Sequence, residues 1–222
     1  MKTIKFAKTC VTMLFSMILL AGCLPSNQLP GIELLDTSEI PYFMDDFSDH
    51  SNGWDLATRQ EGVAEYDGDS LRLYIIGTNR ELITTPGIKL KNASVDADAQ
   101  RVTGPENNIY GLVCRYAGPE NYYGFLISSD GYYAIVKNIN GQRTILNSDS
   151  FEPSEFIQKG GGINHLRILC SGRTLSLYVN DQLMEEVQDI DLVYGGVGML
   201  AATLEEPGTD VRFDNFIVMN LE

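Results

Sequence analysis

The acidic residues Asp96 and Asp98 have the spacing that comes closest to a pair of catalytic carboxylates. In a β-strand, residues two positions apart lie on the same face, with Cα atoms roughly 7 Å apart. Two carboxyl groups about 5–5.5 Å apart across a glycosidic bond could act as acid and nucleophile in its hydrolysis. Acids at alternate positions are also typical of a strand face exposed to water, which is the interpretation that we favour. The sequence therefore predicts no catalytic residue.

The only histidines are His50 and His165. Neither has a partner at the spacing that a zinc site needs, and neither has a nucleophile and an orienting acid at a spacing typical of a catalytic triad. We expect both to be structural or exposed.

Three acids, Asp45, Asp46 and Asp214, are candidate metal ligands. The first two lie in the first expected strand and Asp214 lies in the last one, so their oxygens could converge if these strands are neighbours. Ca²⁺ prefers six to eight oxygen ligands, and carboxylates supply them. Turn capping and protection of an edge strand explain the same acids, and we favour this explanation. Calcium is therefore a hypothesis, and no cofactor is required.

Aromatic side chains and one arginine form the candidate ligand-binding set. The apolar face of a sugar ring packs against an aromatic ring, and a guanidinium group donates to hydroxyl or carboxylate oxygens. Ordinary core aromatics and a solvated arginine are the alternative explanation. The candidates are Trp54, Tyr110, Arg115, Tyr122 and Tyr132.

The N-terminus has the pattern of a cleaved export signal. Three lysines within the first eight residues precede an apolar run over 11–21, which is too short to span a bilayer. The following Leu20-Ala21-Gly22-Cys23 resembles the bacterial lipobox, which implies cleavage after Gly22 and acylation of Cys23. The predicted partner is then membrane lipid, and the predicted location is the extracytoplasmic side of a bacterial cell envelope. A plain signal peptide with an incidental Cys23 is the alternative.

Charge excludes one class of partner. The chain has 16 Lys and Arg against 30 Asp and Glu, a formal charge of −14. Removal of residues 1–22 takes away three lysines and no acid, so the charge changes from −14 to −17. Such a surface repels phosphate backbones, so nucleic acid is not an expected partner.

Two cysteines are left once Cys10 is removed and Cys23 is acylated. Cys114 and Cys170 both alternate in phase with apolar residues of their strands. Outside the cytoplasm such a pair is expected to form a disulfide, although two buried thiols would fit the same pattern.

Strands and turns position all of these residues. Alternating apolar patterns recur throughout the chain after residue 41, and no segment has the periodicity of an amphipathic helix. Asp130-Gly131 and Asn140-Gly141 supply the positive φ angles of tight hairpin turns. The pattern predicts an all-β, two-sheet antiparallel sandwich over 41–222, a signal peptide over 1–22, and a lipidated cysteine with a tether over 23–40. The expected strands include 71–76, 93–102, 110–116, 122–128, 132–139, 142–146, 165–170, 174–179, 183–187, 196–204 and 211–219.

Several short runs follow one another in order along the chain: 43–49 with Gly53-Trp54, 110–116, 121–125, 129–133, 164–168, 178–181, 195–198 and 213–216. Taken together, they resemble the concanavalin A-like jelly-roll superfamily, in particular bacterial laminin-G-like domains and 3-keto-disaccharide hydrolase-like domains related to family 16 glycoside hydrolases. The resemblance implies two curved sheets, adjacent first and last strands, and a concave face that often binds carbohydrate. The Glu-x-Asp-x-Glu run of the retaining glucanases is missing here.

These observations favour a membrane-anchored, non-catalytic module whose partner is a glycan or a surface protein. A glycoside hydrolase of the 3-keto-disaccharide hydrolase-like type is the first alternative. It would need acids such as Asp96, Asp98, Asp189 or Asp191 gathered beside Arg115. A structural envelope lipoprotein is the second alternative, and it is favoured if the concave face is filled by the protein's own side chains.

Overall fold

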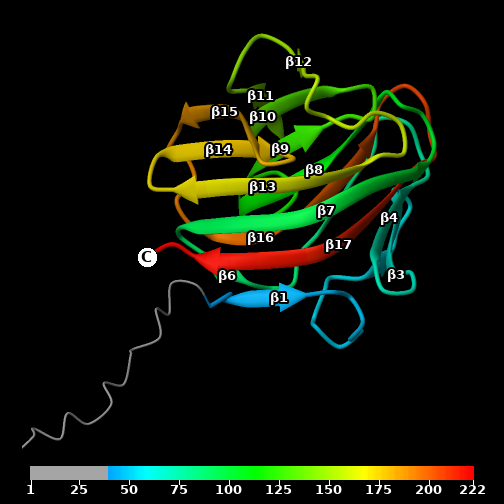
Figure 1. Ribbon diagram of the computed structural model, residues 1–222, viewed down its shortest axis with the longest axis horizontal. Coiled ribbons are helices and arrows are strands. Elements are labelled where there is room, and N and C mark those ends of the chain that lie inside the picture. The colour runs from blue at the N-terminus through cyan, green and yellow to red at the C-terminus, as the bar shows by residue number, and fades with distance from the viewer. Residues whose placement is uncertain (1–39) are drawn as a thin grey trace, which may run out of the picture. The chain divides into compact units, whose positions relative to one another are not determined.

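The computed structural model describes residues 40–222. Within this range the chain forms strands β1 to β17 and no helix. All strand pairs are antiparallel, and they build two sheets that pack face to face. In Figure 1 the strands β13, β7 and β17 of one sheet lie in front of β8, β9 and β16 of the other. The predicted all-β, two-sheet sandwich is confirmed, whereas the predicted signal peptide and most of the tether lie outside the described residues.

The larger sheet, here called sheet A, contains nine strands. Its continuous path has eight members. The ninth strand, β1 (Phe43–Asp45), pairs with residues 216–218 of β17, on the side of β17 opposite β7. In spatial order the path is β15 (Gln182–Gln188), β14 (Thr174–Val179), β13 (Ile163–Ser171), β7 (Ala93–Thr103), β17 (Thr209–Asn220), β4 (Leu71–Ile75), β3 (Gly62–Tyr66) and β2 (Ala57–Thr58).

The other sheet, sheet B, contains eight strands. Two of them are short and lie off its main path, β12 (Glu152–Pro153) beside β10 and β6 (Lys89–Leu90) beside β16. The main path is β11 (Gln142–Ile145), β10 (Tyr132–Ile139), β9 (Tyr122–Ile127), β8 (Asn108–Tyr116), β16 (Gly195–Thr203) and β5 (Glu81–Thr84).

Tight turns fix the register of the hairpins. Asn140 and Gly141 join β10 to β11 with φ angles of 52° and 77°, and Asn180 and Asp181 join β14 to β15 with φ angles of 51° and 64°. Two successive positive φ angles are the signature of the turn that matches the right-handed twist of a hairpin. At Asp130-Gly131 only the glycine has a positive φ, 97°.

The main core lies between the two sheets. One face of each sheet supplies fully buried side chains, for example Leu73 and Phe213 from sheet A and Leu112 and Phe125 from sheet B. The first and last strands are adjacent, because Phe43 of β1 pairs with Val218 of β17, and both strands are labelled side by side in Figure 1. The two ends of the described range therefore pair with each other within sheet A.

Candidate functional site

The outer face of sheet B carries a second apolar cluster, separate from the main core. Its members alternate along the strands with the core residues, so they point away from sheet A. Each is at most 7% exposed, although nothing from sheet A lies over them. Partly buried Tyr116, Ile145, Phe151 and Leu204 pack against this outer cluster. Its buried members are Ile83, Ile109, Val113, Tyr122, Leu126, Ala134, Val136, Leu200 and Ala202.

A glycine makes room for the largest ring of the outer cluster. A Cβ atom at Gly124 would lie 2.9 Å from Val136 Cγ2 and 3.3 Å from Tyr122 Cε2. The space that a side chain would fill is therefore used by the side chains of Val136 and Tyr122, both fully buried. The Tyr122 ring packs among the buried residues of the outer cluster, which form the floor of this face, and only its hydroxyl group contacts polar neighbours.

Three polar side chains meet above this floor, and we call them the bridge: Glu81, Tyr122 and Arg143. The Tyr122 hydroxyl donates to Glu81 Oε1 at 2.6 Å. Arg143 Nη2 donates to the other oxygen of Glu81 and to the Tyr122 hydroxyl. Burial and the Glu81 carboxylate raise the pKa of Tyr122, so its hydroxyl stays protonated and keeps donating at neutral pH. Burial alone lowers the pKa of Arg143, but Glu81 and Tyr122 outweigh it and raise the pKa.

The bridge also shows that this face is concave. Glu81 lies on β5 and Arg143 on β11, the two edges of the main path of sheet B. Five steps of about 4.8 Å would separate these strands by about 24 Å in a flat sheet, too far for two side chains to meet. The ion pair therefore requires the sheet to curl until its opposite edges approach each other over the outer cluster.

At one end of the concave face lies a pocket of about 540 Å³, here called the Tyr132 pocket. Tyr132 is 39% exposed, whereas Ile109, which also lines the pocket, is buried. Asp130 is the one carboxylate in its wall, and the remaining polar groups are amides and hydroxyls. An aromatic ring beside amide, hydroxyl and carboxylate groups is an environment that suits a polyhydroxylated ligand. Its lining residues are Asn107, Asn108, Ile109, Ser128, Asp130, Tyr132, Ser150, Phe151 and Leu204.

Hydrogen bonds in the β9–β10 turn fix the pocket walls. The Ser128 hydroxyl donates to Asp130 Oδ1 and accepts from the backbone N–H of Tyr132 at 3.1 Å. Asn108, which is fully buried, donates to Pro105 O at 2.8 Å and accepts from the N–H of Ser129 at 3.0 Å. The Asp130 carboxylate and the backbone of Tyr132 are therefore held in place by Ser128.

The five predicted ligand-binding residues do not form one surface. Tyr110 belongs to the main core, where Asn164 donates to its hydroxyl at 3.3 Å. Trp54 is also in the main core, 6% exposed, with its ring edge-on to Phe216 at 4.9 Å. Of the set, only Tyr122 and Tyr132 lie on the concave face, and only Tyr132 is exposed. The candidate set therefore does not form one ligand-binding surface, because Trp54 and Tyr110 belong to the main core and Arg115 is also buried.

Arg115 is a structural residue rather than an exposed donor. It is 2% exposed, has a φ angle of 50°, and donates to the carbonyl oxygens of Leu192 and Gly172, each at 2.8 Å, and of Lys91 at 3.3 Å. Burial lowers the pKa of Arg115, while Tyr123 and Asp189 oppose this effect. With this left-handed φ angle, the side chain reaches carbonyl oxygens of the loops at the end of the sandwich.

The candidate calcium ligands do not converge. Asp45 is 2% exposed, and its two oxygens accept from the Trp54 indole N–H and the Phe47 backbone N–H, each at 2.7 Å. Asp46 accepts from Ser48 in a local turn. Asp214 accepts from the Asn215 N–H, and burial with nearby Asp98 and Asp46 raises its pKa. Among residues 40–222, no three His, Cys, Asp or Glu side chains are grouped closely enough to hold a metal ion.

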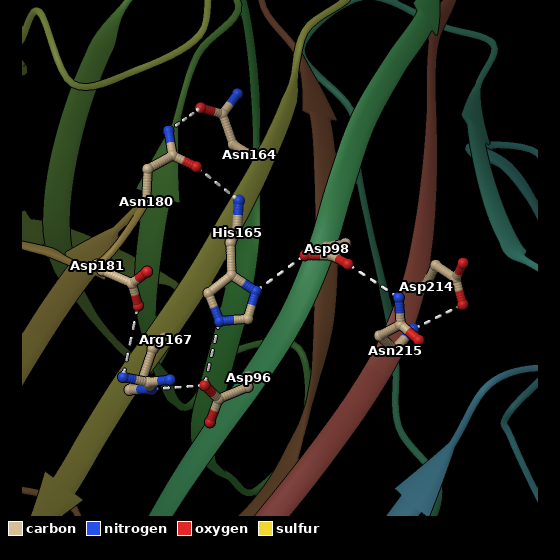
Figure 2. A network of polar contacts seen from close by, with 9 residues as sticks. All are labelled: Asp96, Asp98, Asn164, His165, Arg167, Asn180, Asp181, Asp214 and Asn215. Carbon is tan, nitrogen blue, oxygen red and sulfur yellow. Dashed lines mark hydrogen bonds and ion pairs between the residues drawn. The ribbon is translucent and has the colours of Figure 1, made fainter.

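Asp96 and Asp98 lie on the outer face of sheet A, where they hold a histidine. His165 Nδ1 lies 2.8 Å from Asp98 Oδ1, and Nε2 lies 3.4 Å from Asp96 Oδ1 (Figure 2). Arg167 Nε donates to the same Asp96 oxygen at 2.5 Å, and Asn215 donates to Asp98 at 2.9 Å. The hydrogen bond to Asp96 and the neighbouring Asp98 together raise the pKa of His165 to about 9. Each carboxylate is thus engaged with a basic or amide group of the same sheet.

The other acids of the hydrolase hypothesis are engaged elsewhere. Asp189 accepts from the Tyr123 hydroxyl and from Lys137 Nζ, both at 2.5 Å, and Asp191 accepts from the same Lys137 at 2.6 Å. Asp189 lies near Arg115 through Tyr123, but Asp96 belongs to another face of the molecule. These acids are therefore not gathered in one pocket beside Arg115.

The cysteine pair joins the two sheets. Cys114 of β8 and Cys170 of β13 are bonded through their sulfurs, with Cα atoms 6.7 Å apart. Both residues are buried in the main core. The link therefore runs across the sandwich rather than within a sheet.

Cys23 lies outside the described residues. Within residues 40–222, no helix has the length and apolar character needed to cross a membrane.

Four residues of the concave face were not singled out from the sequence: Glu81, Arg143, Asp130 and Phe151. Glu81 opens a four-residue strand too short for a clear alternation, and Phe151 lies in an irregular segment. Asp130 was interpreted only as a turn residue. Arg143 could have been found from the sequence. The tight turns fix the register, so that Asn138 pairs with both Arg143 and Tyr122 on the two neighbouring strands.

No protein-family model and no curated protein sequence matches the chain. Solved structures do match. The carbohydrate-binding module CBM66 from Bacillus subtilis has a TM-score of 0.60 at 14% identity over 76% of this chain and 96% of its own. A Bacillus subtilis protein of unknown function with a galectin-like fold has a TM-score of 0.61 at 12% identity, covering 81% and 96%. The GH43 protein BlXynB from Bacillus licheniformis has a TM-score of 0.59 at 16% identity, covering 80% of this chain but 39% of its own.

These likenesses define the fold as a galectin-like jelly-roll sandwich, shared with carbohydrate-binding modules and with part of a larger GH43 protein. At such low identity they describe the fold alone.

Proposed function

We propose that this protein binds carbohydrate through the Tyr132 pocket and is displayed outside the cell by a lipid anchor. The observation that carries the proposal is the exposed ring of Tyr132, held beside Asp130 and Phe151 in a pocket at the end of a concave sheet. An apolar ring face for the sugar and fixed polar groups for its hydroxyls are the two requirements of such a site. The fold shared with a carbohydrate-binding module adds support.

The pocket favours binding over hydrolysis. Glycosidases of the common type need two carboxyl groups on either side of the scissile bond. Asp130 is the one carboxylate that lines this pocket, and one of its oxygens already accepts from Ser128. We therefore propose a non-catalytic module, as opposed to a hydrolase of the 3-keto-disaccharide hydrolase-like type.

A structural role is the competing proposal, and one observation favours it. The middle of the concave face is filled by Tyr122, Ile145 and the Glu81–Arg143 ion pair. The Tyr132 pocket lies outside this filled region. The carbohydrate-binding proposal requires that this pocket takes a ligand, whereas the structural proposal requires that it does not.

The decisive experiment is a glycan array probed with the purified protein, its Tyr132→Ala variant and a Tyr194→Ala variant. Tyr194 is 58% exposed in the β15–β16 loop and serves as the matched control. We expect binding to a defined group of glycans by the wild type and by the control, and loss of binding in Tyr132→Ala. No binding to any glycan by the wild type would favour the structural role. The array is run with and without Ca²⁺, since calcium remains a prediction.

The anchor is a separate proposal and rests on the sequence Leu20-Ala21-Gly22-Cys23. Acyl chains on Cys23 would hold the acidic domain at a bilayer, with each buried CH₂ contributing about 0.8 kcal/mol. Mass spectrometry of the protein from the membrane fraction should find a diacylglyceryl group on an N-terminal Cys23. An unmodified terminus, or a Cys23→Ala variant that stays in the membrane fraction, contradicts the anchor.

A further inference from the structure

The concave face has two openings with a covered region between them. The Tyr132 pocket opens beside Ile109 and Leu204 at one end of the outer cluster. A second pocket of about 310 Å³ opens beside Ile83 and Tyr116 and is lined by Glu81. Between these openings the floor residues of the outer cluster are almost fully buried, so no open channel connects the two pockets along the floor.

The bridge closes this middle region. It contains an ion pair and two further hydrogen bonds, all between residues of different strands. The Glu81 side chain is 22% exposed and that of Arg143 is 35% exposed, so solvent screens the pair only in part. Hydrogen bonds between charged partners are stronger than neutral ones, and a buried tyrosine hydroxyl costs free energy if it loses its acceptor. The bridge is therefore a stable barrier across the concave face.

The size of the Tyr132 pocket agrees with a short ligand. Sites for small molecules range from about 300 to 1,000 Å³, and the volume of about 540 Å³ lies in the lower half of that range. A polysaccharide that crossed the concave face would have to displace the bridge and Phe151, which packs on the outer cluster. The end of a chain can enter the pocket without displacing either.

We infer that the Tyr132 pocket takes the terminal unit of a glycan chain and that the bridge excludes internal segments. Glu81 and Arg143 are then specificity-determining residues, although neither lines the Tyr132 pocket. This inference rests on the proposed carbohydrate binding and adds which part of the glycan is recognised.

The test is calorimetric titration with a series of linear oligosaccharides of one linkage, taken from the glycans bound on the array. For a terminal unit, the affinity per mole of chain stays constant within about twofold as the chain lengthens, because each chain has one end. For internal segments, the affinity per mole of chain rises in proportion to the number of positions that can occupy the site. The wild type needs no substitution for this measurement, so folding of a variant is not a concern.

The role of the bridge is tested with Arg143→Ala, and Arg212→Ala is the matched control. Arg212 forms an exposed ion pair with Asp67 at 2.5 Å on sheet A, away from the concave face. We expect Arg143→Ala to gain affinity with chain length and Arg212→Ala to behave as the wild type. Wild-type affinity that scales with length overturns the inference but leaves carbohydrate binding intact. If no glycan on the array binds, carbohydrate binding itself is overturned. If affinity depends on chain length in the same way for Arg143→Ala and for the wild type, the role of the bridge is overturned.

Discussion

The hydroxyl group of Tyr122 donates to a carboxylate oxygen of Glu81 at 2.6 Å, although two strands, β8 and β16, lie between their own strands in sheet B. This contact exists because sheet B curls and because Gly124 leaves room for the Tyr122 ring. One side chain thereby joins the apolar floor of the concave face to the ion pair above it.

Removal of the Glu81 carboxylate should destabilise the fold. In Glu81→Ala the buried Tyr122 hydroxyl loses its acceptor and Arg143 loses its counterion, so we expect a loss of about 1–3 kcal/mol in the free energy of unfolding. Urea denaturation measures this loss. Asp67→Ala breaks an exposed ion pair with Arg212 and should cost at most about 1 kcal/mol. If Glu81→Ala and Asp67→Ala lose the same free energy of unfolding, the bridge contributes no more than an exposed ion pair.

Stability should fall as the pH rises from about 6.5 to 9. The hydrogen bond to Asp96, helped by Asp98, raises the pKa of His165 from 6.5 to about 9 in the folded protein. The folded state thus prefers protonated His165, and the stabilisation is complete below pH 6.5 and lost as the pH passes 9. Because the His165 side chain is 34% exposed, solvent screening reduces the effect to the order of 1 kcal/mol.

The measurement is the free energy of unfolding of wild type and His165→Gln across this pH range. The difference between the two proteins should shrink as the pH rises. A difference that does not change with pH contradicts the assignment of a raised pKa to His165.

Loss of the Cys114–Cys170 disulfide should lower stability without changing the fold. The two cysteines are 56 positions apart, so the bond restricts a long loop in the unfolded chain, which corresponds to about 2–4 kcal/mol. The Cys114→Ala/Cys170→Ala double variant, compared with wild type with and without reductant, measures this contribution. Mass spectrometry verifies that the reductant has fully reduced the disulfide. If the fully reduced wild type is then as stable as the oxidised protein, the account is contradicted.

Much of the fold could be predicted from the sequence because alternation and turn chemistry are local signals. The predicted strands 132–139 and 174–179 coincide with β10 and β14, and most of the others differ by one or two residues at an end. The strands that escaped prediction are short: β2, β3, β5, β6 and β12 have two to five residues each. Such segments are too brief for a period of two residues to be recognised.

The site could be predicted only in part, because it depends on which face each strand turns outward and on contacts distant in sequence. Tyr132 was found as an aromatic candidate, whereas Tyr110 and Trp54 share its residue class but face the main core. Arg115 was a candidate ligand donor, but it is buried and has a positive φ angle, which the local sequence pattern does not predict. The Glu81–Arg143 pair joins residues 62 positions apart through the curvature of a whole sheet.

The central claim, that the Tyr132 pocket binds carbohydrate, is tested most directly by calorimetric titration of the best glycan from the array into wild type, Tyr132→Ala and Tyr194→Ala. Loss of the exposed ring should remove roughly 1.5 kcal/mol of binding free energy, about a tenfold rise in Kd, while Tyr194→Ala keeps the wild-type Kd. Equal Kd values for wild type and Tyr132→Ala, or the absence of any heat of binding in the wild type, would contradict the account.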